Sequence, residues 1–348
     1  MYYFTTYFDK NYLSRGLVLC DSLKEHCERF ELYVLCLDDF TLDFFQKNAR
    51  NYPEVKTLSL NEIEEYDKEF KECKKNRSTI EYYFTLSPCL PLYLLKKYNL
   101  PHICSLDADM MFFSTPTPLF TYLENFSIVI TPHKFSPELK SLEKYGIYNV
   151  SFQIFKNDEV GIACLEKWRN QCIEWCFDYV DNENSRFADQ RYLDDWPTRF
   201  PGVVVLQHKG AGLAPWNITN YHLRLDNGQV VVDSQPLVFF HFHGLKQIRW
   251  WLYNPNLATY RVHADYLLKR RIYGPYIREL QEVDRWISVS LPFNQAHIHM
   301  GSIRGGNPGA TASSNFLRVI TRRIKHQLFA TKKVLQGDIF VVIDGRIV

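Results

Sequence analysis

Two aspartates, Asp107 and Asp109, stand one residue apart directly after an apolar run, and their type and spacing suit metal chemistry. Side chains at alternate positions of an extended backbone point to the same side, so both carboxylates can face one ligand. Mg²⁺ and Mn²⁺ are commonly held by a few carboxylates together with substrate oxygens. Asp-x-Asp alone more often marks a solvated turn. Here it separates two apolar runs, residues 102–106 and 110–113, where unpaired carboxylates would be costly, and this favours a metal site.

The elements that position these aspartates alternate between strand and helix. We expect strands at residues 2–7, 32–37, 55–60 and 102–106, and helices from about residue 12, at 42–51, at 62–75 and, opening at Ser87-Pro88, at 87–97. This order predicts an α/β fold with a mostly parallel, doubly wound sheet through about residue 133. Open sheets of this class bind ligands at the carboxyl ends of their strands, which is where the two aspartates stand.

The second half of the chain has a more mixed pattern. Strands are expected at residues 148–155, 203–206, 230–232 and 237–241, and helices at 159–179 and 256–286. Residues 301–314 are rich in Gly, Ser, Ala and Thr and predict a flexible linker. The last residues, around Asp344-Gly345, have the sequence of a hairpin.

The bulk composition limits the class of protein. The 348 residues are 46% hydrophobic and 23% charged, which is typical of a globular protein with a sizeable core. A net charge of +2 argues against broad nucleic-acid binding. The nine cysteines lie between Cys20 and Cys176, several of them in apolar segments, which favours reduced, buried thiols. The first residues have no signal-peptide pattern and no apolar run is long enough to span a bilayer, so we expect a cytoplasmic protein.

Five segments resemble, in the same chain order, motifs of the glycogenin-type retaining glycosyltransferases, which are sugar-nucleotide transferases of the GT-A fold. The segments are residues 5–26, 106–109, 148–152, 189–190 and 240–244. Two features depart from the family pattern. The third segment lacks the family glycine, and the family lysine near the end falls one position early, at Lys246, without the Pro-Trp that usually follows it.

The resemblance implies roles for the matched residues. Mn²⁺ or Mg²⁺ would be held by Asp107, Asp109 and His241, and Asp189 with Gln190 would lie beside the reacting sugar as the catalytic pair. The residues implied to bind the UDP-sugar donor are Thr5, Thr6, Tyr7, Asp107, Ala108, Asp109, Asn149, Ser151, Gly244 and Lys246.

Each of these assignments has a structural alternative. His241, at the end of an apolar strand, could be a core histidine, although a neutral imidazole beside two carboxylates suits Mn²⁺. Asp189 could cap a following helix. Asn149 and Ser151 could serve only to hydrogen-bond the backbone. Residues 215–217, Pro-Trp-Asn, could stack on an acceptor sugar or form a rigid turn.

The expected reaction moves a sugar from a UDP-sugar to a glycan or lipid-linked acceptor, as in polysaccharide biosynthesis. The metal and Lys246, or Arg249 in its place, would neutralise the departing diphosphate. In a retaining enzyme the leaving phosphate can itself take the acceptor proton. Two alternatives remain open. A nucleotidyltransferase would carry a Gly-rich basic loop after the first strand, which residues 5–11 lack, and a non-catalytic sugar-nucleotide or glycan-binding module would bind without transfer.

A basic segment, residues 316–333, makes a separate suggestion. It carries six Lys and Arg side chains and no acid, with apolar residues every four positions, as in a helix that lies on an anionic membrane surface. A terminal helix packed on the domain, with a solvated basic face, is the alternative. We expect a GT-A domain at 1–255 (a nucleotide and metal half, 1–133, and a sugar and acceptor half, 134–255), a helical extension at 256–300, the linker at 301–314, and the basic helix with the hairpin at 315–348.

Overall fold

The computed structural model describes residues 1–290, 338–343 and 345–348, and the chain divides into two compact units, residues 1–241 and 242–348. The expected linker 301–314 and basic helix 316–333 lie outside the described residues. The expected domain boundaries at 255, 300 and 314 stay predictions. Within the described residues, we find no helix long and apolar enough to cross a membrane.

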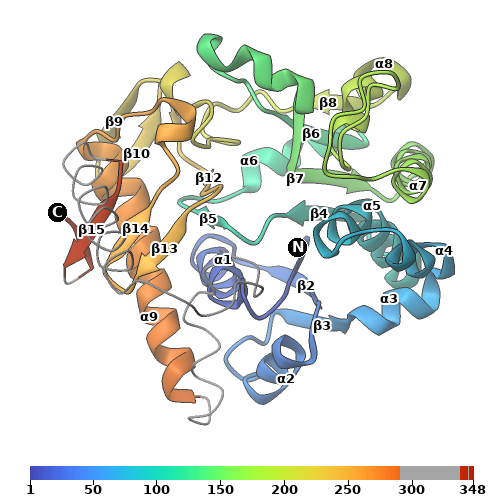
Figure 1. The fold of residues 1–348 in the computed structure, drawn as a ribbon, viewed down its shortest axis with the longest axis horizontal. Helices are drawn as coiled ribbons and strands as arrows, with labels where there is room; N and C mark the ends of the chain where they lie inside the picture. The colour runs from blue at the N-terminus through green and yellow to red at the C-terminus, as the bar shows by residue number, and fades with distance from the viewer. Residues whose placement is uncertain (291–337, 344) are drawn as a thin grey trace, which may run out of the picture. The chain divides into compact units, whose positions relative to one another are not determined.

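The first unit is built on a seven-stranded sheet in the order β3-β2-β1-β4-β7-β6-β8 (Figure 1). Strands β3, β2, β1 and β4 run parallel, β7 is antiparallel to both of its neighbours, and β8 is parallel to β6. The expected α/β class, mostly parallel and then mixed, is therefore confirmed. The strands are β1 Tyr2–Phe8, β2 Phe30–Cys36, β3 Val55–Ser59, β4 His102–Leu106, β6 Ile128–Pro132, β7 Tyr148–Lys156 and β8 Val203–Val205.

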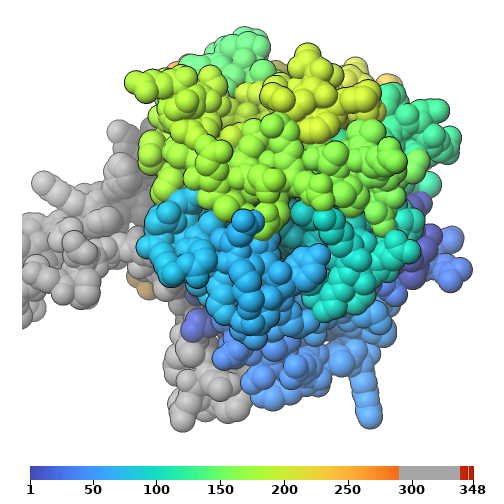
Figure 2. Space-filling model, turned by 90° about the vertical axis from the view of Figure 1, so that its right-hand side faces the viewer, coloured from blue at the N-terminus to red at the C-terminus, as the bar shows by residue number. Residues whose placement is uncertain are grey.

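Helices bury both faces of this sheet. Against one face, the apolar side chains of α3, α5 and α7 form a single core with Tyr33 and Leu35 of β2. On the other, α1 approaches β1 so closely that a Cβ on Gly16 would lie 2.2 Å from the Phe8 ring, so a larger residue there would displace this ring. Figure 2 shows the face where α3 and α4, in blue, lie beneath the yellow-green segment of α7 and α8. The helices are α1 Leu13–His26, α2 Asp39–Lys47, α3 Leu60–Tyr66, α4 Lys68–Glu72, α5 Thr79–Tyr98, α6 Thr117–Phe120, α7 Glu159–Glu174 and α8 Trp196–Arg199.

Three helix predictions in this unit are wrong at their boundaries. The helix expected from Ser87 begins at Thr79, because Ser78 and Glu81 form a capping box, and Pro88 lies inside it. The single charged helix expected at 62–75 is two short helices, because the Asp67 carboxylate accepts the Phe70 N–H and starts a new helix there. The helix expected at 159–179 ends at Glu174.

Short strands complete the first unit. Strand β5, Met110–Phe112, pairs antiparallel with β12, Phe239–His241, in a register that places His241 opposite Met110. Strands β9 Leu223–Asp226, β10 Gln229–Val232 and β11 Gln235–Pro236 form a separate antiparallel sheet. The β5–β12 pair matters most here, because it brings a distant part of the chain to the residue after Asp109.

The second unit consists of an antiparallel sheet and a helix. The sheet has the order β13 Lys246–Arg249, β14 Leu252–Asn254, β15 Phe340–Ile343 and β16 Arg346–Ile347, and the expected terminal hairpin is confirmed as β15–β16. The helix expected over 256–286 is interrupted. A 3₁₀ turn spans Ala258–Tyr260, and a continuous helical path starts only after Asp265, which caps Leu268 and leads through a π-helical turn, Leu268–Tyr273, into α9, Gly274–Ser290.

Candidate metal and nucleotide site

Three potential metal ligands meet at the carboxyl end of β4. His241 Nε2 lies 3.0 Å from Asp109 Oδ1 and 3.6 Å from Asp107 Oδ2, and one ligand atom of each residue lies within 4.8 Å of the other two. The His241 side chain is 6% exposed, that of Asp109 14% and that of Asp107 36%. The cluster therefore opens toward solvent on the Asp107 side, and the structure brings together the three residues predicted to bind metal.

The charges in this cluster are unfavourable without a cation. Burial raises the pKa of Asp107, the imidazole of His241 lowers it, and the neighbouring Asp109 carboxylate raises it again. Burial lowers the pKa of His241, but its hydrogen bond to Asp109 and the two carboxylate charges outweigh this, and the pKa is raised. The raised pKa values mean that Asp107 and His241 bind protons more readily here than in water. A divalent cation would neutralise the same negative charge. Two carboxylates and one imidazole are a donor set that suits Mn²⁺, and the residues fit such an ion.

A buried polar chain from β7 fixes the backbone of Asp107. The Asp107 N–H donates to the Ser151 carbonyl at 3.0 Å. Asn149 Oδ1 accepts hydrogen bonds from the Ser151 N–H at 3.1 Å and from the Ser151 hydroxyl at 2.5 Å. Both side chains are almost fully buried, and Asn149 Nδ2 has no hydrogen-bond partner among the described residues. Asn149 and Ser151, which are predicted to bind the donor, therefore hold the backbone of a candidate metal ligand.

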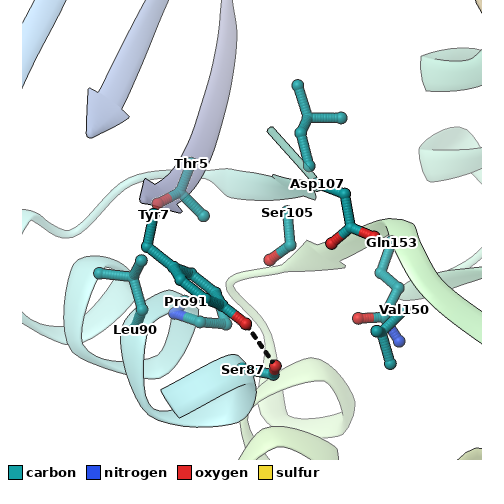
Figure 3. A pocket seen from close by; sticks show the side chains of 10 residues that line it. Thr5, Tyr7, Ser87, Leu90, Pro91, Ser105, Asp107, Val150 and Gln153 are labelled. Carbon is teal, nitrogen blue, oxygen red and sulfur yellow. Dashed lines mark hydrogen bonds between the residues drawn. The ribbon is translucent and has the colours of Figure 1, made fainter. Parts of the chain in front are cut away.

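A small pocket lies beside Asp107 (Figure 3). Figure 3 shows the side chains of Tyr7, Ser105, Asp107 and Gln153 facing the same space, with the Tyr7 hydroxyl 2.9 Å from Ser87 Oγ. Among the described residues, Ser105 Oγ and Gln153 Nε2 are buried and have no hydrogen-bond partner. Buried polar groups without partners are costly, so these atoms are available to a ligand or a bound water.

Asp189 lies close to the same pocket and is 2% exposed. Its pKa is raised to about 7, because burial and the charge of Asp107 raise it by more than the hydrogen bond from Ser87 lowers it. The Asp189 carbonyl accepts a hydrogen bond from Trp168 Nε1 at 2.8 Å, which holds this segment on α7. The preceding residue, Ala188, has φ +46°, a left-handed conformation that is costly for a residue with a side chain and often marks functional sites.

Gln190 and Thr5 both donate hydrogen bonds to backbone carbonyls, and Asp189 does not cap a helix. The alternative that Asp189 caps a helix is wrong, because a 3₁₀ helix starts at Arg191 without a side-chain cap. Gln190 Nε2 donates to the Tyr145 carbonyl at 2.8 Å. Thr5 Oγ1 donates to the Tyr33 carbonyl at 3.0 Å, so its hydroxyl faces β2.

The remaining predicted donor residues divide between the units. Thr6, which is buried, and Ala108, between the two aspartates, lie in the first unit. Gly244 and Lys246 lie in the second, where Gly244 has φ +73° and a Cβ on it would meet the Asn256 amide at 2.3 Å. Contact of Gly244 and Lys246 with the donor stays a prediction.

Sequence reasoning missed three polar pocket residues, Ser87, Ser105 and Gln153. The available signal was polar residues inside apolar strands, since Ser105 follows Cys104 and Gln153 stands between Phe152 and Ile154. Residues 215–217 form a rigid turn rather than an open platform, because Asn217 bonds the Gly212 and His133 carbonyls, and Trp216 is buried with its ring edge against His241.

Comparison with known proteins gives a family but no activity. No family model matches the chain. YfnD of Bacillus subtilis (strain 168), an uncharacterized protein, is 33% identical over 288 residues, which are 82% of this chain and 90% of YfnD. This chain belongs to the YfnD family. YfnF of the same organism, also uncharacterized, is 28% identical over 70% of this chain and 81% of its own length.

Solved structures similar to this member of the YfnD family include three glycosyltransferases. The galactosyltransferase LgtC in complex with donor and acceptor sugar analogs is 14% identical over 80% of this chain and 95% of its own, with a TM-score of 0.49. GlyE of Streptococcus pneumoniae is 13% identical over 83% and 64%, with a TM-score of 0.47. Mouse xyloside xylosyltransferase 1 is 12% identical over 70% and 98%, with a TM-score of 0.44.

Proposed function

We propose that this protein is a metal-dependent retaining glycosyltransferase that moves a sugar from a UDP-sugar to a glycan or lipid-linked acceptor. The observation that carries the proposal is the meeting of Asp107, Asp109 and His241 at the carboxyl end of a parallel strand, beside a pocket with unpartnered buried polar atoms. That edge is where open α/β sheets bind nucleotides and phosphorylated ligands. The five sequence segments with glycogenin-type motifs support the same function.

The three clustered side chains would hold Mn²⁺ or Mg²⁺. When bound, the ion would act as a Lewis acid on the diphosphate that leaves the sugar. Asp107, the most open of the three side chains, faces the space where the diphosphate would lie. Because the Asn149–Ser151 chain fixes the backbone of Asp107, the ligand is held in place before the donor arrives.

The donor nucleotide would lie across the ends of β1 and β4. These strands are neighbours with Thr5 opposite Ser105, so the residues that follow Thr5 are adjacent to the metal cluster. Tyr7 would support the uridine from this strand, and Lys246 would add a positive charge to the diphosphate. Charge-assisted contacts to phosphate are stronger than those between neutral groups.

Asp189 would stabilise the reacting sugar. Glycosyl transfer passes through a transition state with positive charge on the sugar ring, and an ionised carboxylate in a buried position stabilises such charge strongly. Retention then needs no separate carboxylate base, because the leaving phosphate oxygen accepts the proton of the acceptor hydroxyl. Gln190 would lie beside the sugar with Asp189, and its side-chain nitrogen also donates to the Tyr145 carbonyl.

A lipid-linked acceptor would require the protein to work on the inner face of a membrane, and the basic segment 316–333 would then bind anionic lipid there. This part of the proposal rests on sequence alone, since the segment lies outside the described residues.

The deciding experiment is a screen of UDP-sugars for release of UDP with Mn²⁺, Mg²⁺ or chelator. We expect metal-dependent release of UDP from one UDP-sugar, slow when water takes the sugar and faster when an acceptor glycan takes it. Formation of a sugar nucleotide from UTP and a sugar phosphate would instead identify a nucleotidyltransferase. Tight UDP-sugar binding without turnover on any acceptor would identify a binding module.

A further inference from the structure

The β13–β14 hairpin of the second unit ends in two tryptophans. Trp250 and Trp251 form the whole turn, since Arg249 on one strand pairs with Leu252 on the other. Trp250 is 74% exposed, Trp251 38% and the nearby Ile248 39%. Large apolar side chains grouped at a protruding turn are rare on soluble proteins and usually mark a contact surface.

The backbone conformation of this turn does not require tryptophan. Two-residue hairpin turns favour Asn and Gly, because the most common types need a positive φ. Neither Trp250 nor Trp251 has a positive φ, and the pairing is irregular between Gln247 and Arg249. The indoles thus occupy positions that small polar residues would fill more easily.

Hydrogen bonds from two glutamines hold the turn and the strands beside it in place. Gln281 Nε2 of α9 donates to the Trp250 carbonyl at 2.7 Å, and Gln247 Nε2 donates to the Tyr253 hydroxyl at 3.0 Å. Leu252 and Tyr253, directly after the turn, are buried. The backbone of the tip is therefore held in place, which lowers the entropic cost of binding through its side chains.

The charged side chains of the hairpin itself are all positive. Arg249 adjoins Trp250 and is exposed, and Lys246 at the start of the hairpin is exposed too. The part of α9 that contacts the tip through Gln281 carries both signs, since Glu282 and Arg285 are both exposed. No Asp or Glu occurs between Asp233 and Asp265. The exposed charged groups of the hairpin itself, Lys246 and Arg249, are therefore cations that an anionic partner would neutralise. Exposed apolar side chains beside exposed cations match a partner that has an anionic surface over an apolar layer.

We propose that this hairpin tip, with Ile248, Arg249 and Trp250, inserts into the headgroup region of an anionic lipid bilayer. Indoles favour the membrane–water interface, aliphatic side chains gain from burial below it, and arginines gain from anionic headgroups. The inference does not depend on glycosyl transfer and differs from the basic segment 316–333 in its residues and in its use of tryptophan.

The test measures binding of the full chain to vesicles by sedimentation. Vesicles of phosphatidylcholine with about 30% phosphatidylglycerol should bind the protein, pure phosphatidylcholine should bind it much less, and salt should weaken the difference. Trp250→Ala should weaken binding about fivefold to tenfold, and Arg249→Gln about fivefold. Tyr266→Ala, which removes another exposed aromatic of the same unit (68% exposed), is the matched control and should bind as the wild type does.

Two outcomes would overturn the inference. In one, Trp250→Ala binds anionic vesicles as tightly as the wild type while substitution of Arg322 and Arg323 by Gln abolishes binding. In the other, Trp250→Ala leaves vesicle binding intact but raises the KM for a soluble glycan acceptor, which would make the tip a glycan contact. UDP release in solution should be unchanged in Trp250→Ala, so failure of the membrane test and failure of the proposed reaction are separate results.

Discussion

Asp109→Asn is the sharpest perturbation of the candidate metal site. The substitution keeps the size of the side chain and removes one of two negative charges next to His241. Without metal, it should lower the pKa of Asp107 and of His241, since the Asp109 carboxylate raises both. Because repulsion from Asp107 disappears while the attraction to His241 is lost, the two changes oppose each other, and the metal-free protein should change in stability by only about 1 kcal/mol.

The effect with metal should be much larger. Loss of a residue behind a metal ligand costs about 10–100-fold in affinity, so loss of an anionic ligand itself should cost at least about 100-fold. Mn²⁺ at 100 times its Kd stabilises a folded protein by about 2.7 kcal/mol. For a unit of this size that is a rise in Tm of about 5–10 °C. In Asp109→Asn, the same Mn²⁺ concentration should raise Tm by less than about 2 °C.

The assay is thermal unfolding with and without Mn²⁺, together with UDP release. Asp43→Asn is the matched control, because its side chain is 62% exposed on α2 and pairs only loosely with Lys47. It should show the full Mn²⁺ shift and full turnover. If Asp109→Asn kept both the Mn²⁺ shift and the turnover of the wild type, the three-residue metal site would be refuted.

Three further outcomes are expected. Asp189→Asn should slow transfer by about 10²–10³-fold. The pKa of Asp189 is about 7 in the folded protein and about 3.9 in the unfolded chain, so the wild type loses stability as pH rises between these values. The free energy of unfolding of Asp189→Asn should therefore exceed that of the wild type by up to about 4 kcal/mol at pH 8 and equal it at pH 4. Equal wild-type and variant melting curves at pH 8 would contradict this. Ser87→Ala should move the midpoint of the pH–rate profile upward, because the Ser87 hydrogen bond lowers the pKa of Asp189; an unmoved midpoint would remove Ser87 from the site. Lys246→Ala should weaken UDP binding by about 1.5–3 kcal/mol in calorimetry, with the exposed Lys140→Ala as control, whereas a larger loss in Arg249→Ala would show that Arg249 makes the contact.

The strands of the sheet and the residues of the metal cluster can be predicted from the sequence, because each is indicated by a short stretch of neighbouring residues. An apolar strand followed by Asp-x-Asp identifies the carboxyl end of β4, and the later apolar segment ending in His241 supplies a strand to pair beside it. The start of α5 was missed because Pro88 was read as a first-turn residue. The stronger capping box of Ser78 and Glu81 overrides that signal, and the helix accepts proline in its interior at the cost of a backbone hydrogen bond.

The pocket lining could not be predicted for a different reason. Ser105 and Gln153 are exposed to the pocket only because β4 and β7 are neighbours in antiparallel register, with Ser105 opposite Gln153. That pairing joins segments far apart in the chain, and neither residue has a local pattern that separates it from an ordinary buried polar group. The role of Asp189 is similar, since its raised pKa depends on burial by several elements at once.

The pairing of β5 with β12 has a consequence for how the protein matures. Asp109 and His241 are 132 positions apart, so a ribosome adding about 5–20 residues per second makes the two aspartates several seconds before the histidine. A nascent chain can offer a cation only two carboxylates during this interval, and three-ligand coordination becomes available only once the long intervening segment has folded and closed the loop. Tight metal binding at this candidate site would thus be a property of the finished first unit, and an ion bound with full affinity would report that the chain through His241 has reached its native arrangement.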